Sequence, residues 1–118
     1  MARARIDEHT GRDAVRAVLA GTAERTDLAM AVRFLLQALA EANPGRSVEV
    51  RVPPFGAVQT VEGPRHTRGT PPNVVELDAE TFVSIATGSL AWGEAVSAGR
   101  VHASGARSDL SALFPLAY

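Results

Sequence analysis

A change from helical to strand periodicity near residue 45 limits the folds open to this chain more than any other feature. Apolar residues recur every three or four positions from Leu28 to Leu39, and Asn43-Pro44-Gly45 follows them. This spacing is typical of an amphipathic helix with one buried face. Residues 47–52 then alternate valine with polar side chains, which predicts a strand with one apolar face.

The remaining strands are shorter. Strands are expected at residues 56–62, 73–77 and 101–104, and residues 66–70 fit either a strand or an extended loop. Because Pro53 and Pro54 separate the first two strands by a short distance, we expect these strands to form an antiparallel hairpin with an irregular turn.

Helical patterns surround these strands. Asp78 is expected to cap a helix that runs to Thr87 and ends at Gly88, and a second helix is expected from Ser89. A short helix is also predicted before Gly21, and a final short helix is predicted after Ser108.

The order of these elements predicts an α+β fold. No regular crossover helices separate the first strands, so the sheet should be mostly antiparallel, with about five strands and helices on one face. The length of 118 residues suits a single domain. Within it we expect a flexible arm at residues 1–11, helices at 12–45, and the sheet with the C-terminal helices at 47–118.

Composition restricts the function. The net charge of −1 argues against nucleic acid as a partner, since such proteins rely on excess positive charge. The chain has no cysteine, no signal-peptide pattern and no apolar run long enough for an integral membrane segment. We therefore expect a cytoplasmic protein, for which transient membrane contact and the oligomeric state stay open.

Motifs for catalysis are missing. His9, His66 and His102 are far apart and belong to no metal-binding pattern, and no nucleophile elbow or phosphate-binding loop occurs. We therefore expect no enzyme activity, no metal and no cofactor. His102 alternates with apolar neighbours and should point to solvent.

The second half of the chain resembles the sterol carrier protein family. The similarity rests on the spacing Asp78-x3-Phe82-x2-Ile85-x2-Gly88-x3-Trp92-x2-Ala95-x3-Gly99-x-Val101-x3-Gly105. The proline-containing residues 51–59 and 66–76 are similar to the actinobacterial branch of this family. The resemblance runs from about residue 48 to residue 116 and implies a five-stranded sheet covered by helices, with an apolar cavity between the layers.

This resemblance implies binding of lipids, fatty acyl groups or other apolar small molecules. The residues expected to line or cover the cavity are Phe34, Leu35, Val58, Phe82, Ile85, Trp92 and Phe114. His66 and Arg68 are the polar candidates for contact with a ligand head group. Each apolar residue could equally be ordinary packed core. The alternative function is a non-catalytic accessory or protein-interaction module with a closed cavity, and the sequence does not identify the ligand.

Overall fold

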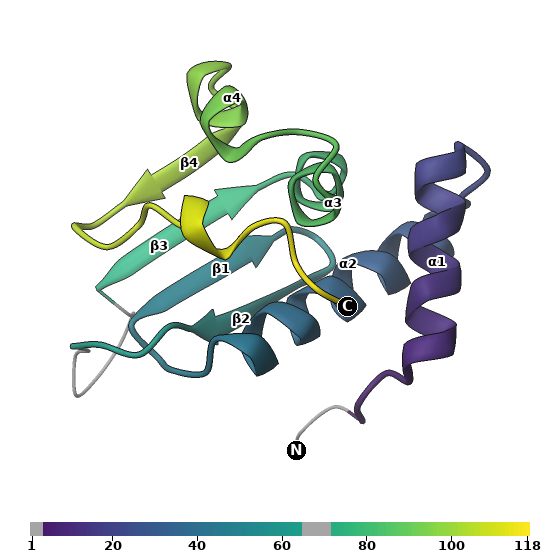
Figure 1. The fold of residues 1–118 in the computed structure, drawn as a ribbon, viewed down its shortest axis with the longest axis horizontal. Coiled ribbons are helices and arrows are strands. Elements are labelled where there is room, and N and C mark those ends of the chain that lie inside the picture. Colours follow the sequence, from purple (N-terminus) through teal and green to yellow (C-terminus); the bar gives the residue numbers. More distant parts are fainter. Residues whose placement is uncertain (1–3, 65–71) are drawn as a thin grey trace.

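The valine-rich strand after the long helix lies inside a four-stranded sheet, as the computed structural model in Figure 1 shows. The structure describes residues 4–64 and 72–118. Its elements in chain order are α1 (Glu8–Ala20), α2 (Arg25–Ala42), β1 (Val48–Val52), β2 (Gly56–Thr60), β3 (Asn73–Leu77), α3 (Ala79–Thr87), α4 (Trp92–Ser97), β4 (Val101–Ser104) and the 3-10 turn η1 (Ser111–Leu113).

The sheet has the strand order β2-β1-β3-β4. β1 pairs antiparallel with β2, and β3 pairs antiparallel with β4, but β1 and β3 run parallel. Val48, at the start of β1, pairs with Thr60 at the end of β2 and with Asn73 at the start of β3. The chain therefore enters β3 at the end of the sheet where β1 begins, and β3 must run in the direction of β1.

These observations confirm the α+β class and refine the expected sheet. The described residues form four strands rather than about five, and residues 66–70, the remaining candidate strand, lie outside the described part of the chain. The predicted hairpin of β1 and β2 is present. The one parallel pairing was not anticipated, because short strands alone carry no signal for the order in which they pair.

The first helix begins earlier than expected. α1 starts at Glu8 because the carboxylate of Asp7 accepts a hydrogen bond from the Thr10 N–H at 3.2 Å and caps the helix. Residues 8–11, which the sequence analysis assigned to a flexible arm, are therefore the first turn of α1. Upstream, the Arg5 guanidinium binds the Glu41 carboxylate through two hydrogen bonds of 2.8 and 2.9 Å.

α2 is buried on more than one face. α3 and β2 pack against one side of it, and α1 packs against another, on the side of the molecule away from β4 (Figure 1). This second contact explains why its buried residues exceed the single predicted stripe: they are Ala29, Ala31, Val32, Phe34, Leu35, Leu36 and Leu39.

The C-terminal third forms shorter helices than the sequence predicted. α3 begins after Asp78 and ends at Gly88, as expected, and Gly88 adopts a left-handed conformation with a φ of 88°. α4, however, begins at Trp92 rather than at Ser89. The predicted last helix is only the single turn η1, and Pro115 follows it. No helix within residues 4–64 and 72–118 has the length and apolar character needed to cross a bilayer.

Candidate functional site

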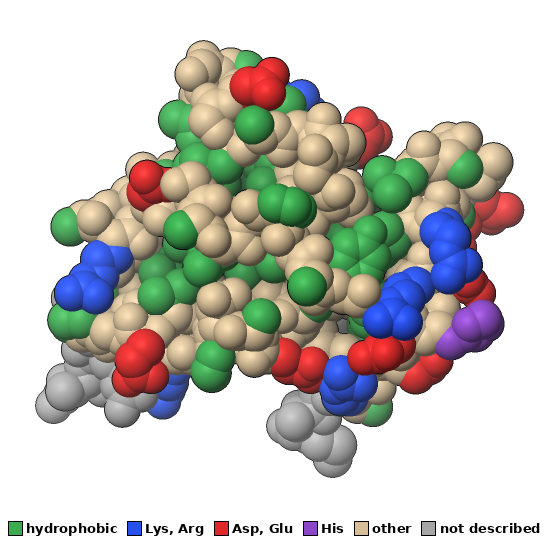
Figure 2. Space-filling model, in the orientation of Figure 1, with side chains coloured by type: hydrophobic (Ala, Val, Ile, Leu, Met, Phe, Trp, Pro, Cys, Tyr) green, Lys and Arg blue, Asp and Glu red, His purple; other side chains and the backbone are tan. Residues whose placement is uncertain are grey.

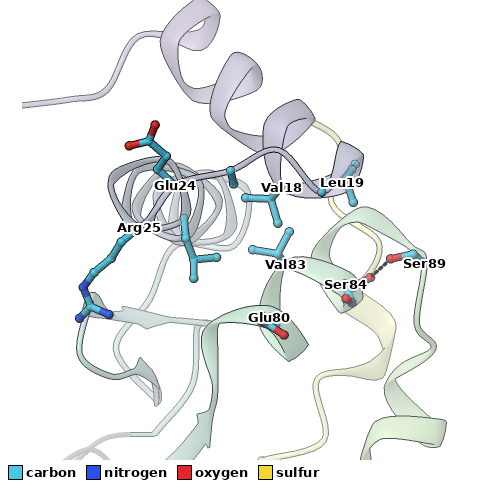
Figure 3. A pocket seen from close by; sticks show the side chains of 11 residues that line it. Val18, Leu19, Glu24, Arg25, Glu80, Val83, Ser84 and Ser89 are labelled. Atoms are coloured by element: carbon cyan, nitrogen blue, oxygen red, sulfur yellow. Dashed lines mark hydrogen bonds between the residues drawn. The ribbon is translucent and has the colours of Figure 1, made fainter.

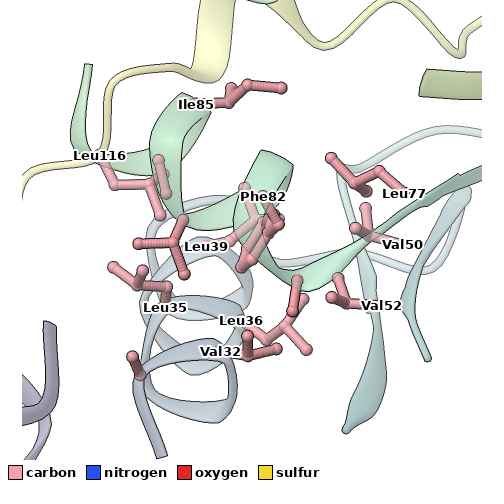
Figure 4. Packing of buried hydrophobic residues seen from close by; sticks show 14 of the residues in the cluster. Val32, Leu35, Leu36, Leu39, Val50, Val52, Leu77, Phe82, Ile85 and Leu116 are labelled. Carbon is pink, nitrogen blue, oxygen red and sulfur yellow. The ribbon is translucent and has the colours of Figure 1, made fainter. Parts of the chain in front are cut away.

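The layer between the sheet and the helices is filled by side chains. Figure 4 shows Leu39 of α2, Phe82 of α3 and Val50 of β1 in this layer, and each is at most 1% exposed. Five grooves stand out among the described residues, and none of the five is lined by these three side chains. The candidate ligand sites among the described residues are therefore the open grooves.

One of these grooves gathers aromatic side chains. It lies between the α3–α4 connection and the C-terminal segment and has a volume of about 460 Å³, and we call it the aromatic groove.

 A second groove, of about 570 Å³, lies between α1 and α3 and shares Ser89 with the aromatic groove. The residues that line the aromatic groove are Ile85, Gly88, Ser89, Leu90, Ala91, Trp92, Gly93, Glu94, Ser111, Phe114 and Pro115.

Three rings form one wall of the aromatic groove and the core beneath it. The indole of Trp92 stacks on the ring of Phe114, with the centroids 5.9 Å apart and the planes 9° from parallel. Phe82 meets the edge of Phe114 at 6.5 Å and is fully buried. Phe114 therefore connects the groove to the core, and it is itself only partly buried.

Backbone contacts hold both sides of the groove. On one side, Gly88 ends α3, and the Leu90 N–H donates to the Ser84 carbonyl at 3.1 Å. On the other side, the Leu116 N–H donates to the Ala86 carbonyl at 2.9 Å. Because the Leu116 side chain is also buried, the C-terminal segment is fixed next to α3 with Phe114 turned toward Trp92.

The lining of the groove is mostly apolar. Glu94 is its one charged residue among those that the structure describes, and Ser89 and Ser111 supply hydroxyl groups. The Ser89 hydroxyl donates to the Ser84 carbonyl at 3.2 Å. Such a surface can hold an apolar ligand by contact and leave a polar head group in water. Within the described ranges, no three His, Asp or Glu side chains come together as metal ligands.

The predicted site residues fall into separate regions. Ile85, Trp92 and Phe114 meet in the aromatic groove, and Phe82 lies directly beneath it. The other predictions lie elsewhere or outside the described residues: Leu35 is in the core, Phe34 packs edge-on against Tyr118 at 6.2 Å, Val58 lines a groove beside Leu36, and His66 and Arg68 are in the part of the chain that the structure does not describe.

Among the residues of this groove, only Ile85, Trp92 and Phe114 were predicted as site residues. Leu90, for example, falls in the helix that was expected from Ser89. Gly88 and Pro115 lie close together in the structure, since a Cβ at Gly88 would lie 3.3 Å from the Pro115 ring, and no local pattern in the sequence signals this contact. His102 is exposed, as predicted.

The fold and the groove define a small α+β domain with an open apolar site at one edge of a filled core. The chain matches the family described as bacterial SCP ortholog over residues 24–116, so it belongs to this sterol-carrier-protein-like family. A comparison with curated proteins found no match. The matched range contains the whole aromatic groove and begins after α1.

Proposed function

We propose that the protein binds lipids, fatty acyl groups or similar apolar small molecules without catalysing a reaction on them. The ligand chain would lie in the aromatic groove, against Trp92 and Phe114. Family membership supports lipid binding as the class of function. The apolar lining of the aromatic groove supports this groove as the position of the ligand.

The observation that carries this proposal is the stacked pair of Trp92, which is 9% exposed, and Phe114, which is half-buried, in the lining of a groove within the matched region. A volume of about 460 Å³ falls within the range of small-molecule sites. Each 100 Å² of apolar ligand surface that is buried there contributes roughly 2.5 kcal/mol. In Figure 2 hydrophobic side chains are interspersed among other atoms in the middle of the face, while charged side chains gather toward its lower right edge.

Replacing Phe114 tests this site. Phe114→Ala removes one of the two stacked rings and should weaken binding of 1-dodecanoylglycerol about tenfold, the effect of losing roughly 1.4 kcal/mol of contact. This lipid is neutral, so Glu94 neither attracts nor repels its head group. Equilibrium dialysis with radiolabelled lipid measures the affinity.

The matched control is Phe55→Ala. Phe55 is a largely buried ring that lies beneath the Arg25 guanidinium and lines none of the five grooves. This variant should lose stability but keep the wild-type affinity. Equal affinities of the wild type and Phe114→Ala, with both proteins folded by circular dichroism, would remove the aromatic groove from the proposal.

The filled interior favours a second function, a non-catalytic accessory module that binds another protein. In that case the family fold is retained while the layer between sheet and helices, represented by Leu39, Val50 and Phe82, admits no ligand. A wild-type protein that takes up no lipid in the dialysis experiment would support this module over the carrier.

A further inference from the structure

The largest of the five grooves lies between α1 and α3, and Ser89 is the one lining residue that it shares with the aromatic groove. It has a volume of about 570 Å³, and we call it the α1 groove. The residues that line it are Val18, Leu19, Gly21, Ala23, Glu24, Arg25, Leu28, Glu80, Val83, Ser84 and Ser89. Figure 3 shows Val18 and Val83 pointing toward one another across it.

Two different parts of the chain form this groove. The residues at positions 18–23 precede the family match, whereas those from Glu24 to Ser89 lie inside it. The family region alone therefore lacks one wall of the groove. The presence of α1 gives this chain a hollow that the matched domain does not build by itself.

The groove combines apolar walls with a negative edge. Leu19 is 52% exposed, although burial of a leucine is normally favourable. The lining holds two carboxylates, Glu24 and Glu80, and neither takes part in the ion pairs found within the described residues. The one cation of the lining, Arg25, has its guanidinium 5.0 Å from the centre of the Phe55 ring.

We propose that the α1 groove is a second binding site, which takes an aliphatic chain with a cationic head group. Val18, Leu19 and Leu28 contact the chain, and the Glu80 carboxylate attracts the head group. A fatty acid with a carboxylate head is disfavoured here by the same negative edge. This site does not depend on ligand binding in the aromatic groove.

Dodecylammonium and dodecanoate have the same chain length but head groups of opposite charge. At micromolar concentration, their affinities therefore compare the two head groups directly. Dodecylammonium should bind at least threefold more tightly, and Glu80→Gln should reduce that preference by about two- to fivefold, as expected for a solvent-exposed charge pair. Isothermal titration calorimetry measures both affinities. Methyl NMR should show shifts at Val18 and Leu28 on addition of dodecylammonium.

Leu19→Ser tests the apolar wall, with Val96→Ser as its matched control. Both side chains are exposed, by 52% and 45%, but Val96 lines none of the five grooves. Leu19→Ser should weaken dodecylammonium binding about fivefold, and Val96→Ser should leave it unchanged. Equal affinity of both variants and the wild type would overturn the proposal.

Gly11→Ala tests the part played by α1. A Cβ at Gly11 would overlap the Phe34 ring, so this substitution pushes α1 away from α2 without altering any residue of the groove. Dodecylammonium binding should fall, while binding of 1-dodecanoylglycerol stays as in the wild type. Loss of the neutral lipid alone would count against the aromatic groove, and unchanged dodecylammonium binding would count against the α1 groove.

Discussion

At the scale of single residues, capping side chains decide where helices begin. Asp78 was predicted to cap α3, and its carboxylate accepts from the Thr81 N–H at 3.1 Å and from the Thr81 hydroxyl at 2.5 Å. Burial alone would raise the pKa of Asp78, but these hydrogen bonds and the charge of Arg100 outweigh it and lower the pKa. Asp7 caps α1 in the same way and was missed, because Thr10 and Asp13 are equally good caps in the sequence.

The lowered pKa of Asp78 predicts how its variants respond to acid. The stability due to the ionised form is present above the ordinary aspartate pKa, near 4, and is lost as the pH falls through the lowered value. Asp78→Ala should cost about 1 kcal/mol at neutral pH, whereas Asp78→Asn should cost less there and flatten the acid dependence. Urea unfolding between pH 7 and pH 2.5 measures this, and an unchanged acid dependence in Asp78→Asn would contradict it.

At the scale of elements, periodicity identified the long segments and failed at the short ones. α2 and β1 carry enough repeats for the pattern to be clear. Residues 89–91 and 108–114 have apolar residues at helical spacing, but in the structure they are a connection and a single 3-10 turn. Their conformation depends on contacts that are distant in sequence, such as the bond from Leu116 to Ala86.

Leu116 is therefore expected to hold the C-terminal segment in place. Leu116→Ala should destabilise the protein by about 2 kcal/mol, because the side chain is 9% exposed and packs into the core. In this variant, the backbone N–H of residue 116 should also exchange with solvent faster than in the wild type, when both rates are measured relative to the N–H groups of β1. A variant with wild-type stability and exchange would show that the segment is fixed by other contacts.

At the scale of the whole molecule, the sequence predicted the class of fold and the family. The resemblance to sterol carrier proteins is confirmed as a family relationship, while the actinobacterial branch stays a prediction. Ile85, Trp92 and Phe114 were expected to line or cover an interior cavity, whereas the structure places them in the lining of one open groove, which no periodicity shows. Their part in ligand binding stays a prediction. The parallel pairing of β1 with β3 and the groove beside α1 both depend on how segments that are distant in sequence pack together. Local patterns do not encode this packing.

Trp92 gives the most direct test of the central claim, since it is the only tryptophan in the chain and lies in the aromatic groove. We predict that titration with 1-dodecanoylglycerol changes the Trp92 fluorescence in a saturable way, with one lipid bound per chain, and that Phe114→Ala weakens this response. Emission that stays constant up to the solubility limit of the lipid would contradict binding in the aromatic groove.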